Sequence, residues 1–203
     1  MASNDQEVEV KFPVRDLPAI GARLEALGAR VTAPRMREIN LRFDTPDGAL
    51  SKERRVLRLR QDAGSVMTFK GPSQPGESVS VRQEIEFTVS DFAAARRLLE
   101  ALGYAVVVTY EKFRTTYALH NLLVVLDELP FGSFIEIEGD DAESIHAAAD
   151  ALGLDWGARS SSSYLALFAE LSAARGLRAK NLTFDELAGV QAHPKDMGLR
   201  YAD

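Results

Sequence analysis

The sequence predicts an α+β fold in which one antiparallel sheet of about eight strands carries helices on one of its faces. Three observations lead to this prediction. Several segments alternate charged and apolar residues with the period of two that is typical of β-strands. Three or four segments with helical periodicity and capping residues separate them. Most strand connections are short and turn-like, which favours antiparallel pairing.

The first strand shows the alternation most clearly. It reads Glu-Val-Glu-Val-Lys over Glu7–Lys11, so two carboxylates and an amine share one strand face. The valines share the opposite face and are typical of a core. Asp16 is then a plausible helix N-cap, and Gly28 marks the expected end of that helix.

The middle of the chain repeats strand and turn signals. An extended segment over Arg35–Phe43 leads to a turn rich in Asp, Pro and Gly. The segments Val56–Gln61 and Ser65–Lys70 flank a tight-turn signal and predict a hairpin. A Gly/Pro loop over Gly71–Gly76 then precedes a strand over Ser80–Thr88.

A second helix follows, with Ser90 or Asp91 as its N-cap. Its apolar face is predicted to include Leu98, Leu99 and Leu102. The remaining expected elements are strands over Ala105–Tyr117, Leu122–Glu128 and Ser133–Gly139, and helices over Asp141–Leu152 and Ser162–Ala173.

No linker rich in Gly, Pro or Ser divides the chain. We therefore expect a single domain over residues 1–175. Residues 176–203 are polar and lack a clear period, which predicts a loosely attached C-terminal tail with a short helical turn near Phe184 to Leu187.

Composition excludes several classes of function. The formal net charge of −6 argues against nonspecific binding to nucleic acid. Cysteine is absent, so disulfides, thiolate metal sites and cysteine nucleophiles are excluded. The N-terminus lacks a signal-peptide pattern, and no apolar run is long enough to span a bilayer. We expect a cytoplasmic protein, monomeric or homodimeric, whose partner is a small molecule and not a nucleic acid or a membrane.

The charged strand faces are the candidate functional feature. One solvated face is ordinary in an antiparallel sheet. Here, however, long charged side chains recur on nearly every strand, and the helices need the apolar face. The charged face is then left to curl inward, and about eight strands can close into a barrel with room for one small ligand. The basic set is Lys11, Arg58, Arg60, Lys70, Arg82, Lys112 and Arg114. The acidic set is Glu7, Glu9, Glu84, Glu86, Asp127, Glu136 and Glu138.

A lumen with both signs of charge has a chemical use. Lysines and arginines would bind a polyanion such as a chain of phosphates. Clustered carboxylates would bind a hard divalent cation, Mg²⁺ or Mn²⁺, through oxygen ligands. Together they suit phosphoryl transfer achieved by placement and electrostatics, which requires no serine or cysteine nucleophile.

The same residues resemble the CYTH superfamily of triphosphate tunnel metalloenzymes over roughly residues 5 to 172. Glu7–Lys11 is similar to the Glu-x-Glu-x-Lys signature of that family, and the resemblance continues in order along the chain. The further matching segments are Phe43-Asp44-Thr45, Leu57-Arg58-Leu59-Arg60, Thr68-Phe69-Lys70-Gly71-Pro72, Arg82-Gln83-Glu84-Ile85-Glu86, Glu111-Lys112-Phe113-Arg114, Leu126-Asp127-Glu128, Phe134-Ile135-Glu136-Ile137-Glu138 and Ser163-Tyr164.

The resemblance implies a closed, eight-stranded antiparallel β-barrel, or tunnel, that binds a triphosphate, with the helices packed outside. It implies a phosphate-binding role for the basic set above. It also implies that the acidic set binds the metal or positions water, and that Lys11 or Glu9 helps to activate water.

Three functions remain open from the sequence. The first is a metal-dependent triphosphatase acting on inorganic triphosphate, thiamine triphosphate or a nucleoside triphosphate. The second is a class IV adenylate cyclase that converts ATP to cyclic AMP and pyrophosphate. The third is a noncatalytic module that binds polyphosphate or nucleotide. The tunnel motifs alone do not identify the organic portion of the substrate or the preferred metal.

Overall fold

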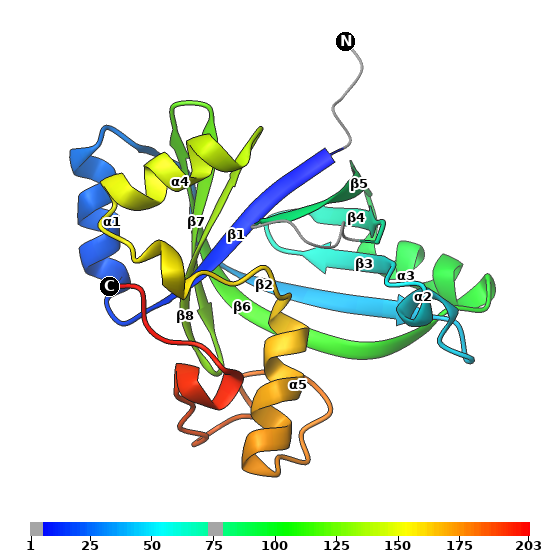
Figure 1. The fold of residues 1–203 in the computed structure, drawn as a ribbon. Helices are drawn as coiled ribbons and strands as arrows, with labels where there is room; N and C mark the ends of the chain where they lie inside the picture. The colour runs from blue at the N-terminus through cyan, green and yellow to red at the C-terminus, as the bar shows by residue number, and fades with distance from the viewer. Residues whose placement is uncertain (1–5, 73–78) are drawn as a thin grey trace.

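The computed structural model describes residues 6–72 and 79–203, and for Gln6 and Glu7 it describes the backbone alone. Within these residues eight antiparallel strands form a ring (Figure 1), in the order β1-β5-β4-β3-β2-β6-β7-β8. The ring closes because β1 pairs with both β5 and β8. The predicted antiparallel sheet of eight strands is confirmed, and its two ends meet. The strands are β1 (Gln6–Val14), β2 (Arg30–Asp44), β3 (Val56–Gln61), β4 (Ser65–Lys70), β5 (Ser80–Thr88), β6 (Ala105–Leu119), β7 (Leu122–Leu129) and β8 (Gly132–Gly139).

Side-chain caps begin the four longer helices, and the two caps predicted from the sequence, Asp16 and Asp91, are confirmed. The caps are Asp16 for α1 (Leu17–Ala26), Asp91 for α3 (Phe92–Ala101), Asp141 for α4 (Ala142–Ala151) and Ser163 for α5 (Tyr164–Arg175). Each cap accepts a hydrogen bond from a backbone N–H in the first turn, which satisfies a donor that has no partner within the helix. The sequence did not predict α2 (Ala49–Lys52) or the 3₁₀ turns η1 (Trp156–Ala158) and η2 (Pro194–Met197).

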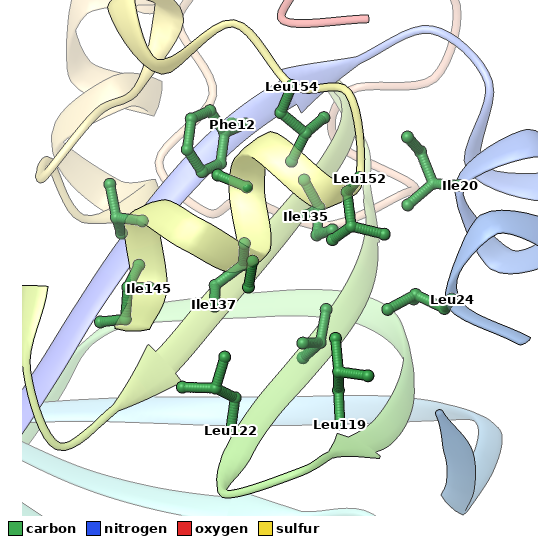
Figure 2. Close-up of a cluster of buried hydrophobic side chains, with 14 of the residues drawn as sticks. Phe12, Ile20, Leu24, Leu119, Leu122, Ile135, Ile137, Ile145, Leu152 and Leu154 are labelled. Carbon is green, nitrogen blue, oxygen red and sulfur yellow. The ribbon is translucent and has the colours of Figure 1, made fainter. Parts of the chain in front are cut away.

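The main core lies between the outer face of the ring and helices α1 and α4. Figure 2 shows Phe12 of β1 and Ile135 and Ile137 of β8 on the side of the sheet that faces these helices. Ile20 of α1 and Ile145 of α4 meet them, and all five side chains are completely buried. Because strand side chains alternate, this apolar packing turns Glu9, Lys11 and Glu136 to the interior of the ring.

The helices do not cover the whole outer face. Leu99 of α3 is buried, but Leu98 and Leu102 are 61% and 65% exposed. The expectation that all three lie on a buried helix face is therefore wrong for two of them. The outward side chain of Phe87 on β5 is also 55% exposed, so the α3 side of the ring is less well covered than the α1 and α4 side.

Residues 177–203 pack against the ring, so the prediction of a loosely attached tail is wrong. Leu182 is completely buried and exchanges backbone hydrogen bonds with β6, where β7 no longer pairs. The Ala202 N–H donates to Pro13 O of β1, and the Asp203 carboxylate accepts from the Arg15 N–H. A hydrogen-bonded turn does occur near Phe184, since the Leu187 N–H donates to Thr183 O. The segment folds here because it satisfies strand edges that would otherwise remain unpaired.

Each helix within the described ranges is too short or too polar to cross a membrane. The predicted loop over Gly71–Gly76 and the side chain of Glu7 lie partly or wholly outside the described residues.

Candidate functional site

The interior of the ring holds a cavity of about 590 Å³ lined largely by charged side chains. Its lining includes all seven residues of the predicted basic set. Of the predicted acidic set, Glu9, Glu84, Glu86, Glu136 and Glu138 line it. The inward turn of the charged strand faces, predicted from the sequence, is confirmed for these residues.

One charged cluster lies where β1 meets β8 and β5. Lys11 and Glu9 are buried, and Lys11 Nζ lies 2.7 Å from Glu9 Oε1 and 3.8 Å from Glu136 Oε2. Arg82 Nη2 lies 3.3 Å from Glu9 Oε1. Burial alone would lower the pKa of Lys11, but Glu136 and Glu9 outweigh it and raise that pKa above its ordinary value. Lys11 is therefore a fixed cation at neutral pH.

A second cluster joins β3, β4 and β5. Lys70 stands opposite Glu84 in the β4–β5 register, and their charged atoms are 3.1 Å apart. Glu86 receives a hydrogen bond from Thr68 Oγ1 at 2.8 Å and lies 3.4 Å from Arg58 Nη2 and 3.7 Å from Arg60 Nη2. Arg60 also pairs with Asp62 at 3.1 Å, but the Nε atoms of both arginines lack a hydrogen-bond partner, which leaves part of their capacity for another anion.

A third cluster, on β6 and β7, is centred on Asp127. Its carboxylate accepts two hydrogen bonds from Arg114, at 2.6 and 2.5 Å, and one from Lys112 at 3.1 Å. The Tyr164 hydroxyl of α5 donates a further one at 2.8 Å. Burial would raise the pKa of Asp127, but Arg114 and Lys112 lower it overall. Burial and the neighbouring Asp127 raise the pKa of Tyr164 well above its usual range.

The carboxylate of Asp127 is not accessible to a metal ion in the cavity. It is completely buried, and it does not border the cavity. Its oxygens are already occupied by a guanidinium, an ammonium and a hydroxyl. The geometry favours a role in anchoring Lys112 and Arg114 from behind, with Tyr164 completing the anchor.

Several residues of the cavity were not predicted from the sequence. Glu38 and Arg42 of β2, Tyr110 of β6 and Tyr164 of α5 all line it. For Glu38 and Arg42 the signal was present, since Glu38-Ile39-Asn40-Leu41-Arg42 alternates polar and apolar residues like the first strand. The outward-facing Arg37 obscured it, because that residue makes the segment look polar on both faces.

The residues available to hold a metal fit its donor chemistry only in part. Glu9 stands directly opposite Glu138 in the β1–β8 register, and Glu136 is the next inward residue of β8. Oxygen donors of this kind suit Mg²⁺ or Mn²⁺. Among residues 8–72 and 79–203, whose side chains are described, however, no three acidic or histidine side chains converge closely enough to hold an ion. Instead, Glu9 and Glu136 are paired with cations, so a metal would have to displace Lys11 or Arg114 from them.

Comparisons with known proteins identify relatives of the chain and of its fold. The chain is 31% identical over 135 residues to an adenylate cyclase, CyaB, from Aeromonas hydrophila, a match covering 64% of this chain and 67% of that protein. The fold is similar to a candidate adenylate cyclase from Vibrio parahaemolyticus (TM-score 0.73, 23% identity, 80% of this chain and 97% of that one). It is also similar to HpAC1 from Hippeastrum, a candidate adenylyl cyclase with a dominant triphosphatase activity (TM-score 0.61, 22% identity, 80% and 95% covered).

The sequence model of one family, described as the CYTH domain, matches residues 5–156. These residues include all the strands of the ring and the predicted charged residues that line it. The chain belongs to the CYTH domain family.

Proposed function

We propose that this protein is a metal-dependent triphosphatase that hydrolyses a triphosphate substrate inside the ring, which acts as a tunnel. The observation that carries the proposal is the convergence of lysines and arginines from β1, β3, β4, β5 and β6 on one cavity. A flexible, multiply charged anion such as a triphosphate is complementary in charge to a cavity lined by these cations. The dominant triphosphatase activity of HpAC1, a protein of similar fold, supports the choice of reaction.

The charge balance of the cavity is the reason to invoke a metal. Over the described residues, eight lysine or arginine side chains and seven acidic ones line it. A triphosphate must therefore compete with carboxylates that already pair with the cations. A divalent cation bound to the released carboxylates would remove this competition and would neutralise developing charge on the phosphate oxygens.

The residues divide into two groups under this proposal. We assign phosphate binding to the predicted basic set, and metal binding to Glu9, Glu136 and Glu138 together with Glu7. Lys11 is better suited to hold a phosphate than to accept a proton, because its raised pKa keeps it charged. Glu9, 2.7 Å from Lys11, is the better candidate for orienting the attacking water.

The second candidate function is adenylate cyclase. The relative from Aeromonas hydrophila carries that name at 31% identity, which favours it independently of the cavity. Both reactions would use the same cations, because both substrates present a triphosphate. They differ in the nucleophile, which is water for the hydrolase and a ribose hydroxyl for the cyclase.

One assay separates these functions. Purified protein is given tripolyphosphate, thiamine triphosphate or ATP with Mg²⁺, Mn²⁺ or EDTA, and phosphate, pyrophosphate and cyclic AMP are quantified. A triphosphatase releases phosphate only with metal, whereas cyclic AMP with pyrophosphate from ATP would establish the cyclase. Tight binding without any product would contradict both and support the noncatalytic module.

Two matched substitutions locate the activity. We expect Glu9→Gln to abolish turnover while it still unfolds in one cooperative transition, at a lower temperature than the wild type because Lys11 loses its closest buried anion. Glu128→Gln, on the outer face of β7, is the control and should retain activity. Full activity of Glu9→Gln would remove Glu9 from the site.

A further inference from the structure

A row of three polar residues on β2 is not explained by triphosphate binding alone. Glu38, Asn40 and Arg42 occupy alternate positions of the strand, and Glu38 and Arg42 line the cavity. The row lies between the strands that carry most of the cations, with Glu38 opposite Lys112 of β6 and Arg42 opposite Arg58 of β3.

Glu38 is a buried carboxylate with unused hydrogen-bonding capacity. It is only 3% exposed, and its Oε2 atom has no hydrogen-bond partner. Lys112 Nζ lies 3.6 Å from Oε2 and Arg114 Nε lies 3.9 Å from Oε1, which are ion-pair distances but too long for hydrogen bonds. By contrast, Asp127 binds the same two cations with short hydrogen bonds.

The rest of the row is also incompletely satisfied. Asn40 is completely buried, and neither its amide nitrogen nor its amide oxygen has a partner. Arg42 has no carboxylate within ion-pair distance in the described part of the chain, and its Nε has no partner. Buried polar groups are normally satisfied, so the two cavity-lining residues Glu38 and Arg42, both with free hydrogen-bonding capacity, point to a missing ligand.

The chemistry of Glu38 restricts what that ligand can be. A carboxylate accepts hydrogen bonds and repels phosphate, so a bare triphosphate gains nothing from it. A neutral group with an O–H or N–H would satisfy it. The cavity, at about 590 Å³, falls within the range of sites that enclose a drug-sized ligand.

We propose that the β2 row binds the organic portion of an organic triphosphate, and that Glu38 accepts a hydrogen bond from a hydroxyl or amino group of that portion. The inference rests on the proposed triphosphate site and adds a specificity to it: the protein selects organic triphosphates over inorganic triphosphate. Arg42 extends the same cavity surface along the strand, and Asn40, which is completely buried behind the cavity wall, lies between the two.

The test compares ligands that share a triphosphate and differ in the rest. Dissociation constants for tripolyphosphate, thiamine triphosphate, ATP and 2′,3′-dideoxy-ATP are measured by calorimetry, with EDTA and with Ca²⁺, for the wild type, Glu38→Gln and Glu38→Asp. Glu128→Gln serves as the matched control on the outer face. Thermal unfolding in each variant establishes that it is folded. Glu38→Asp retains the negative charge on a shorter side chain. It therefore provides the test if the glutamine variant fails to fold.

We expect the wild type to bind at least one organic triphosphate more tightly than tripolyphosphate. Both Glu38 variants should lose about tenfold to a hundredfold of that affinity, the usual strength of one hydrogen bond to a charged group. Affinity for tripolyphosphate should stay constant or increase in Glu38→Gln, because this substitution removes one negative charge from the cavity lining. If dideoxy-ATP binds like ATP, the donor is an amine; if its affinity falls, the donor is a ribose hydroxyl.

Two outcomes would overturn the inference. If the affinities of all ligands fall together, Glu38 only holds Lys112 and Arg114 in place. If the wild type binds tripolyphosphate as tightly as every organic triphosphate, the row does not contact the organic portion. Failure of the proposed triphosphate site is a separate result, because the wild type would then bind no triphosphate at all, and failure of hydrolysis is detected by the product assay above.

Discussion

Replacement of Asp127 by asparagine is the sharpest test of the charge arrangement. The carboxylate is completely buried and is held by Arg114, Lys112 and Tyr164 at 2.5 to 3.1 Å. Asp127→Asn keeps the shape but leaves two buried cations without their closest anion. Breaking a buried ion pair by removing one partner costs about 3–5 kcal/mol of folding free energy. In a chain of this size, that corresponds to a drop on the order of 10 °C in the unfolding temperature.

The assay is urea and thermal unfolding of Asp127→Asn beside Glu128→Gln. Glu128 is the next acidic residue along β7, but its partner Arg35 is exposed, so its loss should cost under about 1 kcal/mol. Tripolyphosphate should restore part of the stability of Asp127→Asn, because its phosphates supply the missing negative charge. A loss of metal affinity at unchanged stability would refute this reasoning and return Asp127 to the metal-ligand role that the sequence suggested.

Three further predictions address other parts of the molecule. Arg58→Ala should weaken tripolyphosphate binding by about tenfold to a hundredfold in calorimetry, since a buried guanidinium is lost; unchanged affinity would exclude a phosphate role. Hydrogen bonds from Ser51 and nearby N–H groups outweigh burial and lower the pKa of Asp44 from 3.8 to about 2. In the unfolded chain Asp44 has its ordinary pKa, so it is protonated at a higher pH than in the folded chain. The free energy of unfolding, measured by urea titrations, should therefore decline between about pH 4 and pH 2. The free energy of unfolding of Asp44→Asn should decline less steeply over this pH range. A decline as steep as that of the wild type would contradict the lowered pKa of Asp44. Leu182→Ala should cost about 2–5 kcal/mol in urea unfolding because the side chain is completely buried; a loss below about 1 kcal/mol would indicate a loosely held segment after all.

Local sequence patterns were sufficient to predict the helices and strands and the face of the sheet on which most charged side chains lie. Alternation of charged and apolar residues along β1 and β8 fixes which side chains face the helices, because a strand has only two faces. The caps Asp16 and Asp91 were recognisable because capping depends on a side chain and a backbone N–H three residues later. These features involve residues that are near in sequence.

Long-range pairing decided what the sequence left open. Lys11 is paired with Glu136 because β1 and β8 lie side by side, although 125 residues separate them. Asp127 became an anchor because α5 brings Tyr164 to it, which no local pattern indicates. Residues 177–203 have no period of their own, and they are ordered by the unpaired edges of β1 and β6 that they cover.

By itself, the sequence determined a ring of antiparallel strands with its charges turned inward, because both follow from side-chain alternation and from helices that need an apolar face. Only the tertiary structure decided which cation meets which carboxylate, and which polar groups on β2 remain without partners. Those outcomes depend on the register between distant strands, and the register is set by the packing of the whole ring.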